Sequence, residues 1–174
     1  MTVLDEIEAA IPALRRYAQA LLRDRAAADD LVQDCLERAL ARRAGWRGEG
    51  SVRGWMFRIL VNLHHDGQRQ LSRGPHLSVV GEDMAEFSRP GAQEGHMALR
   101  EVQAAITRLP DDQRQALLLV ALEGMSLVEA AAVLGLAEGT LASRLGRARA
   151  SLRAATGRES AKAVRPRNEG TVQP

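Results

Sequence analysis

The chain has 174 residues, of which 45% are hydrophobic and 26% are charged, a globular composition that excludes global disorder. No apolar run approaches the roughly 20 residues that a membrane-spanning helix needs. The first ten residues carry acidic groups and no basic one, unlike a signal peptide. A single cysteine, Cys35, excludes an internal disulfide framework and a cysteine-based zinc site. We therefore expect a soluble, cytoplasmic protein with no direct membrane insertion.

The net charge of +2 does not by itself predict a polyanionic partner, but the order of the charges does. Residues 38–73 hold eight arginines and two acidic residues, and residues 144–167 hold eight basic residues and one acidic residue. An acidic stretch, residues 82–112, separates the two basic blocks. This segregation favours two polyanion-facing surfaces on one chain, with ordinary solvated helix faces as the alternative.

The apolar residues follow helical spacing and show no convincing strand alternation, so an all-α fold is predicted. Three helices are expected in the N-terminal part: one kinked or restarted at Pro12, one over Ala28–Arg43, and one from the cap Ser51 to about Arg69. The first should bury one stripe, formed by Leu4, Ile7, Ile11, Leu14, Ala18 and Leu21. The second should bury Leu31, Val32, Cys35, Leu36 and Ala39, and the third should place Trp55 in the core.

Residues 72–95 are rich in Gly, Pro and Ser, a composition that predicts a flexible linker. Helical spacing then resumes and stops at Pro110, after which Asp111 is expected to cap a short apolar helix. Four helices are predicted in this C-terminal part. The sequence thus predicts two small helical domains, residues 1–71 and 96–157, followed by a polar tail, residues 158–174.

The segment Leu127–Leu152 carries a helix-turn-helix pattern. Ser126 and Glu129 form a capping box, Gly135 is expected to be left-handed, and the last helix should span Glu138–Ala155. Leu141, Leu145, Ala148 and Leu152 should face inward. The opposite face is small and polar, with Gly139, Ala142, Ser143, Gly146, Arg147 and Ala150. Such a face suits a helix lying deep in the major groove of DNA, whereas a plain helical hairpin is the alternative.

The third helix has a second face, on which Arg58, Asn62, His65 and Arg69 recur at helical spacing. Arg53 lies one turn earlier, and Trp46 and Arg47 lie in the preceding glycine-rich loop. Aromatic rings with cations and an amide favour single-stranded or distorted nucleic acid. The alternative is that the aromatic residues near this face belong to the core.

Two further clusters give weaker signals. Asp30, Gln33, Asp34 and Glu37 share a face of the second helix, which is either solvated or a contact surface for a basic protein partner. Adjacent histidines on a helix point about 100° apart, so the pair His64 and His65 does not predict a metal site. No nucleophile with its base and no phosphate-cradling loop is present, so neither an enzyme, a cofactor nor a small-molecule substrate is expected.

Four segments stand in the order of a known family: Asp29–Asp34 (DDLVQD), Arg53–Asn62 (RGWMFRILVN), Leu109–Arg114 (LPDDQR) and Gly139–Arg149 (GTLASRLGRAR). Together they resemble bacterial RNA polymerase sigma factors of the extracytoplasmic-function (ECF) group. The resemblance implies a sigma region 2-like domain at residues 1–71 and a region 4-like domain at residues 96–157. It implies the partners RNA polymerase core, promoter DNA and an anti-sigma factor.

The resemblance also assigns roles to residues. Docking on the polymerase core is implied for Asp29, Asp30, Leu31, Gln33, Asp34 and Glu37. Capture and reading of the −10 element is implied for Trp46, Arg47, Arg53, Arg58, Asn62, His65 and Arg69. Recognition of the −35 element is implied for Gly139, Thr140, Ala142, Ser143, Arg144, Gly146, Arg147 and Arg149. Relatives often carry a basic residue at the position of Ala142 and a larger one at Gly146, so the −35 sequence is not predicted.

The sequence therefore predicts a promoter-specificity subunit that catalyses nothing itself. Two alternatives remain open at this point. One is a helix-turn-helix regulator that binds DNA without polymerase, and the other is a sigma-like decoy that binds an anti-sigma factor. The pair His64–His65 is unusual in this helix of the family, and the sequence suggests no further role for the pair than a phosphate contact.

Overall fold

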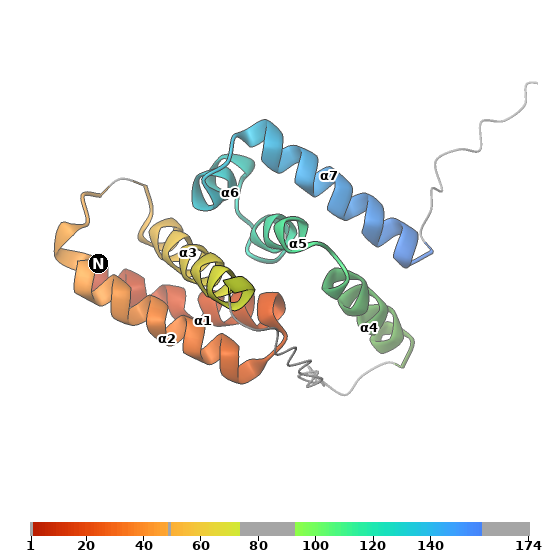
Figure 1. Cartoon of the computed structure of the whole chain (residues 1–174), viewed down its shortest axis with the longest axis horizontal. Coiled ribbons are helices and arrows are strands. Elements are labelled where there is room, and N and C mark those ends of the chain that lie inside the picture. The colour runs from red at the N-terminus through yellow and green to blue at the C-terminus, as the bar shows by residue number, and fades with distance from the viewer. Residues whose placement is uncertain (1, 49, 74–92, 158–174) are drawn as a thin grey trace, which may run out of the picture.

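The structure, a computed structural model, describes residues 2–48, 50–73 and 93–157 (Figure 1). All regular structure in these residues is helical, and it divides into an N-terminal and a C-terminal domain, which confirms the predicted fold class. The predicted linker and the polar tail fall largely or wholly outside the described residues. Helix occupies both ends of the predicted linker, because one helix continues to Arg73 and the next begins at Gln93.

The N-terminal domain consists of α1 (Val3–Leu22), α2 (Arg25–Arg42) and α3 (Val52–Arg73), which pack against one another. A short 3₁₀ turn, η1 (Arg43–Gly45), follows α2. Each helix begins at a side-chain cap: Thr2, Asp24 and Ser51 accept hydrogen bonds from backbone amides three residues ahead. The largest fully buried side chains of this domain are Tyr17, Phe57, Leu14, Leu21, Met56 and Leu60.

Helix α1 runs through Pro12 as one continuous helix, so of the two expected outcomes the restart is absent. Leu4 and Trp55 are less buried than expected. Leu4 lies on the predicted face but is 49% exposed, because too few side chains cover the first turn of the helix. Trp55 is only half-buried, and the neighbouring Phe57 is the aromatic residue of α3 that fills the core.

The C-terminal domain consists of α4 (Gln93–Thr107), α5 (Asp111–Leu117), α6 (Leu127–Leu134) and α7 (Glu138–Ala155). The predicted capping box of Ser126 and Glu129 is confirmed, as are the left-handed Gly135 (φ 64°) and the bounds of α7. Leu141, Leu145 and Ala148 face inward as predicted. Asp111, however, is not an N-cap. Pro110 occupies that position, and the Asp111 carboxylate is held by side chains instead.

The end of α5 widens into a π-helical turn, η2 (Leu118–Leu122). Its hydrogen bonds span more residues than those of an α-helix: the amide of Glu123 donates to the carbonyl of Leu118 at 3.0 Å. Gly124 then reverses the chain with a φ of 67°. This turn places Glu123 at the side of the domain that faces α1 and α3.

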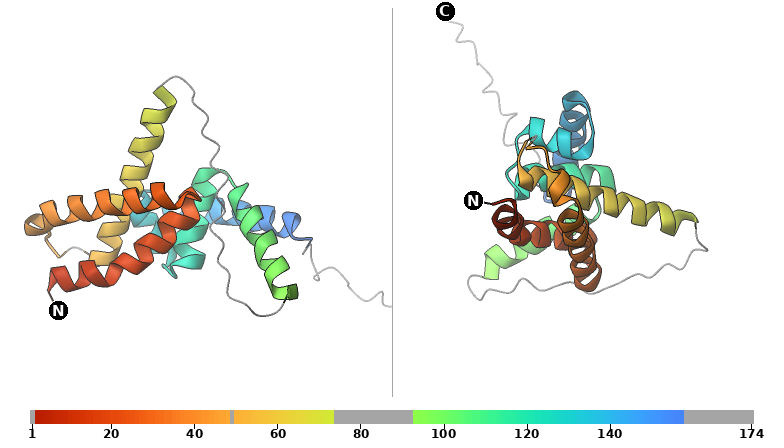
Figure 2. Two further views of the ribbon diagram at one scale, coloured as in Figure 1. Left: turned by 90° about the horizontal axis from the view of Figure 1, so that it is seen from below. Right: turned by 90° about the vertical axis from the view of Figure 1, so that its left-hand side faces the viewer.

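The two domains pack against each other, with α3 lying along α6 and α1 lying against η2 (Figures 1 and 2). Polar side chains bridge this boundary. Arg16 and Arg53 both bind the carboxylate of Glu123, and Arg58 donates to the carbonyl of Ala132 at 2.7 Å. The domain boundary is therefore held by charge-assisted hydrogen bonds as well as by apolar contacts.

A second polar cluster joins α3 to α5. Nε2 of His64 lies 3.2 Å from Oδ2 of Asp111, and Nε2 of His65 lies 3.0 Å from Oε1 of Gln115. Asp111 also accepts hydrogen bonds from Arg114 and Gln115. Burial alone would raise the pKa of Asp111, but the hydrogen bonds from His64, Arg114 and Gln115 outweigh it and hold that pKa well below its usual range.

This depressed pKa predicts how the stability depends on pH. The unfolded chain protonates Asp111 near pH 3.9, so the charged carboxylate stabilises the folded state above about pH 4 and that contribution is lost as the pH falls further. We expect Asp111→Asn to lower the free energy of unfolding by about 1.5–3 kcal/mol at pH 7. Urea unfolding of both proteins from pH 7 to pH 2.5 should show the difference shrinking below about pH 4.

The neighbouring Asp112→Asn is the matched control. Asp112 is more exposed and pairs with Arg144 across the surface, so its replacement should cost less than about 1 kcal/mol at pH 7. A difference between Asp111→Asn and the wild type that stays constant over the whole pH range would show that the charge of Asp111 does not stabilise the fold.

Candidate nucleic-acid interface

Helix α7 presents the face predicted to recognise the −35 element. Seven of the eight residues assigned to that element are exposed: Gly139, Thr140, Ala142, Ser143, Gly146, Arg147 and Arg149. Arg144 is the exception, because it is half-buried and its Nε lies 3.3 Å from Oδ2 of Asp112 on α5. Arg144 therefore joins α7 to α5, and the other seven residues form the open face.

Two glycines on this face have no structural requirement within the described chain. A Cβ built on Gly139 or Gly146 meets no atom within 4 Å, and neither residue has a positive φ. Gly146 lies in the interior of α7, where glycine costs about 0.5–1 kcal/mol relative to alanine. An external surface that approaches the helix backbone closely would account for this cost.

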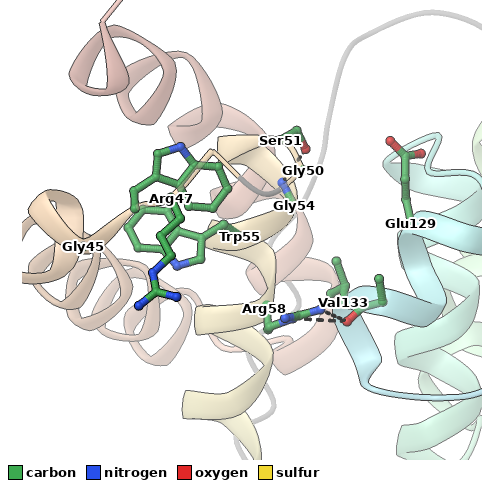
Figure 3. Close-up of a pocket in the computed structure, with 11 residues that line it drawn as sticks. Gly45, Arg47, Gly50, Ser51, Gly54, Trp55, Arg58, Glu129 and Val133 are labelled. Atoms are coloured by element: carbon green, nitrogen blue, oxygen red, sulfur yellow. Dashed lines mark hydrogen bonds between the residues drawn. The ribbon is translucent and has the colours of Figure 1, made fainter.

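The loop before α3 forms an aromatic hollow. The indole rings of Trp46 and Trp55 lie 5.2 Å apart, and both are half-buried. Figure 3 shows Arg47 beside Trp55 and Arg58 directed toward α6, with Glu129 and Val133 of α6 across the hollow. The hollow is lined by Gly45, Trp46, Arg47, Gly50, Ser51, Gly54, Trp55, Arg58, Glu129, Ala132 and Val133. The predicted −10 surface and the C-terminal domain thus meet at one site.

The residues predicted to bind the −10 element divide into two groups. Arg47, Asn62 and Arg69 are exposed, and Arg69 makes a surface ion pair with Asp66 at 3.6 Å. Arg53, Arg58 and His65 instead make hydrogen bonds to the C-terminal domain. Three of the seven residues predicted to bind the −10 element are therefore engaged by the chain itself.

The acidic face of α2 is open. Asp29, Asp30, Gln33, Asp34 and Glu37 are exposed, and Leu31 is half-buried. The amide of Gln33 donates to Glu37 at 3.1 Å, one helical turn away. The structure brings the six residues predicted to dock on the polymerase core onto one accessible helix.

Sequence reasoning missed the residues that bridge the domains: Arg16, His64, Asp111, Gln115 and Glu123. The two partners of each contact lie 47 to 107 residues apart along the chain, so no spacing pattern connects them. The adjacent histidines were the one visible signal. His64 is buried and also lies 3.1 Å from the amide of Gln68, so its role is to bind α5 rather than a phosphate.

The described part of the chain offers neither a metal-binding cluster nor a membrane-spanning helix. It holds no cluster of three or more histidine, cysteine or acidic side chains that could bind a metal ion. Cys35 is fully buried and lies 3.4 Å from the carbonyl of Met56, and burial raises the pKa of its thiol to about 12. None of the helices described combines the length and apolar character needed to cross a bilayer.

Comparison with known protein families covers both domains. Residues 7–61 match the family described as the Sigma2 domain of PhyR, and residues 99–152 match the family described as Sigma-70, region 4. The two matches correspond to the two helical domains of the structure.

Full-length relatives and solved structures agree with this result. The chain is 41% identical over 150 residues to the ECF RNA polymerase sigma factor EcfG of Rhodopseudomonas palustris (strain TIE-1), covering 86% of this chain and 82% of the relative. It is 37% identical over 140 residues to the ECF sigma factor SigM of Mycobacterium tuberculosis (strain ATCC 35801 / TMC 107 / Erdman), covering 80% and 69% of the two chains.

Among solved structures, the sigma factor RpoE in its complex with the anti-sigma factor NepR from Bartonella quintana superposes with a TM-score of 0.73 at 32% identity, covering 90% of this chain and 97% of that one. Sequence, fold and domain order thus agree over most of the length, and the chain belongs to the ECF group of RNA polymerase sigma factors.

Proposed function

We propose that this chain is an alternative sigma factor, which binds RNA polymerase core and directs it to a specific set of promoters. The observation that carries the proposal is the open face of α7, whose small residues no contact within the described chain requires. Membership of the ECF group supports the same function. The chain supplies recognition and no catalytic group, acts in the cytoplasm, and leaves the chemistry to the polymerase.

The proposed mechanism divides the work between the two domains. The C-terminal domain reads duplex DNA in the major groove through α7, where a good base contact contributes about 1–3 kcal/mol of discrimination. The N-terminal domain holds an unpaired base near Trp46 and Asn62, and that binding offsets the few kcal/mol that unstacking costs. Docking through α2 places both sites on one polymerase, so the two modest affinities act together.

An anti-sigma factor is the proposed regulatory partner. Solved complexes of the relatives RpoE with NepR and CnrH with the cytosolic domain of CnrY support this assignment. Such a partner would hold the chain inactive by covering its polymerase-binding or DNA-binding surfaces.

The deciding experiment is multi-round transcription by purified core polymerase, with and without this chain, on a genomic promoter library. New start sites that appear only with the chain support the proposal. Specific DNA binding without polymerase would instead identify a stand-alone helix-turn-helix regulator. Binding to an anti-sigma factor with no new start site would identify a sigma-like decoy.

The docking assignment predicts the effect of reversing one charge. Asp34 is exposed on α2, and an arginine there would repel a basic partner surface. We expect Asp34→Arg to weaken binding to core polymerase by at least about tenfold in a fluorescence titration. Glu8→Arg makes the same charge change on the exposed side of α1 and should leave binding unchanged. Equal affinity for Asp34→Arg and the wild type would rule out the α2 docking face.

The −35 assignment predicts a loss of sequence discrimination. Arg147 is exposed on the open face of α7, where it would contact a base edge or a phosphate. We expect Arg147→Ala to reduce the preference of the holoenzyme for a selected −35 element by about 1–3 kcal/mol, measured by competition with a scrambled element. Arg153→Ala, in the last turn of the same helix, is the control and should retain the preference.

The −10 assignment predicts a defect in strand opening alone. Trp46 stacks against Trp55 at the rim of the hollow, and base stacking on an aromatic side chain is worth about 1–3 kcal/mol. Trp46→Ala should therefore reduce permanganate reactivity of the opened thymines while binding of the holoenzyme to duplex promoter persists. Trp46→Phe retains an aromatic ring and should recover most of the opening. Normal opening by Trp46→Ala would remove this residue from the site.

A further inference from the structure

We propose that Arg16, Arg53 and Glu123 form a latch that keeps the free chain closed, with its own C-terminal domain lying over the −10 face of α3. Holding a melted promoter strand on the polymerase would then require this latch to open. The inference rests on the proposed function for the identity of the covered face, but the latch itself is a property of the free chain.

The contacts of Glu123 carry the proposal. Arg16 binds its carboxylate with two hydrogen bonds, from Nε at 3.0 Å and from Nη2 at 2.7 Å. Nη2 of Arg53 lies 2.9 Å from the same carboxylate and 2.9 Å from the backbone carbonyl of Glu123. The Glu123 side chain is 0% exposed, and the side chains of Arg16 and Arg53 are 49% and 39% exposed.

Aromatic side chains of the N-terminal domain pack against one arginine of the latch. The guanidinium of Arg53 lies 5.2 Å from the centre of the Phe57 ring, which packs edge-on against Tyr17. Both arginines belong to the N-terminal domain, whereas Glu123 belongs to the C-terminal domain. A buried carboxylate that loses such partners must return to water, so the closed state depends on both arginines.

Three further side chains of α3 contact the C-terminal domain in the described part of the chain. Arg58 donates to a backbone carbonyl of α6, His65 contacts Gln115, and His64 contacts Asp111. These polar contacts accompany an apolar one, because a single cluster of buried hydrophobic side chains runs through both domains. Residues 74–92, nineteen in number, connect the domains and could span at most about 65 Å when fully extended.

The closed state affects the three proposed binding surfaces differently. The docking face of α2 and seven of the −35 residues on α7 remain exposed. In contrast, Arg53, Arg58 and His65 are engaged by the C-terminal domain. Glu129 of α6 lines the hollow on the side opposite Trp55, where its carboxylate would repel a DNA phosphate that enters (Figure 3). The closed chain can therefore meet polymerase but cannot hold a melted strand.

Such an equilibrium lowers the apparent affinity for any partner that requires the open chain, in proportion to the open fraction. Weakening the latch should therefore do two things together. It should separate the domains in the free protein, and it should reduce the concentration of chain needed to activate the polymerase.

The test begins with single-molecule energy transfer between dyes on Glu8→Cys in α1 and Ser151→Cys in α7, both exposed positions. Cys35 stays unlabelled because it is buried and its thiol pKa is raised to about 12. In this labelled full-length chain, Glu123→Gln and Arg16→Gln are compared with the wild type, and Glu101→Gln on the exposed side of α4 is the matched control. Circular dichroism establishes that each variant is helical.

We expect the wild type and Glu101→Gln to give one population with the same transfer efficiency. Glu123→Gln and Arg16→Gln should increase the ratio of open to closed molecules by at least about tenfold, the loss expected for a hydrogen bond to a charged group. In transcription with core polymerase, the same two variants should reach half-maximal activity at a lower concentration. Arg16 is half-exposed, so its variant tests the latch even if Glu123→Gln is poorly folded.

The latch is overturned if the wild type is already open or if Arg16→Gln retains the wild-type transfer efficiency. It is also overturned if the domains separate but the half-maximal concentration does not fall. Absence of polymerase-dependent transcription by every variant and by the wild type would contradict the proposed function, whereas the transfer measurement would still decide the latch.

Discussion

A carboxylate buried between two domains is the interaction on which the arrangement of this protein depends. Glu123 is shielded from water, and the side chains that neutralise it, Arg16 and Arg53, both come from the other domain. Burying an ionised carboxylate without such partners would cost several kcal/mol, so this pairing fixes where the C-terminal domain can sit. Each half of the chain thus depends on the other for the electrostatics of their shared boundary.

In this arrangement of the domains, the surfaces proposed to bind polymerase and DNA are not equally exposed to solvent. The acidic face of α2 and the small-residue face of α7 remain open to large partners, whereas part of the cationic face of α3 is engaged: Arg53, Arg58 and His65 bond to the C-terminal domain. Arginines that suit nucleic-acid backbone also suit a glutamate or a carbonyl oxygen, because both are acceptors of the same geometry. The same side chains therefore serve an internal contact and, under the proposal, a promoter strand.

What could be predicted from the sequence was local. The bounds of α7, the capping box of Ser126 and Glu129 and the inward face of Leu141 and Leu145 follow from spacing and capping rules. These features depend on neighbours within about four residues, so periodicity detects them. The exposed residues of α2 and α7 were predicted for the same reason.

The errors arose where tertiary contacts override local preference. Aspartate is a residue type that often caps helices, but the carboxylate of Asp111 instead contacts His64 of α3. Trp55 fits the apolar stripe of α3, yet it stands at the rim of a hollow beside Trp46 while Phe57 takes the interior position. The contact between Arg16 and Glu123 joins residues 107 positions apart, and a single sequence carries no signal for such a pair.

The π-helical turn at the end of α5 has an evolutionary consequence. A wide turn of this kind is equivalent to one residue inserted into an α-helix, and each inserted residue rotates everything after it by about 100°. Glu123 meets its arginines only because the turn of residues 118–122 comes directly before it. If a homologue lost one residue from this turn, a glutamate at the aligned position would point in another direction and would not reach the arginines. Changes in helix register, and not only changes in residue identity, would therefore determine which members of the lineage share this geometry.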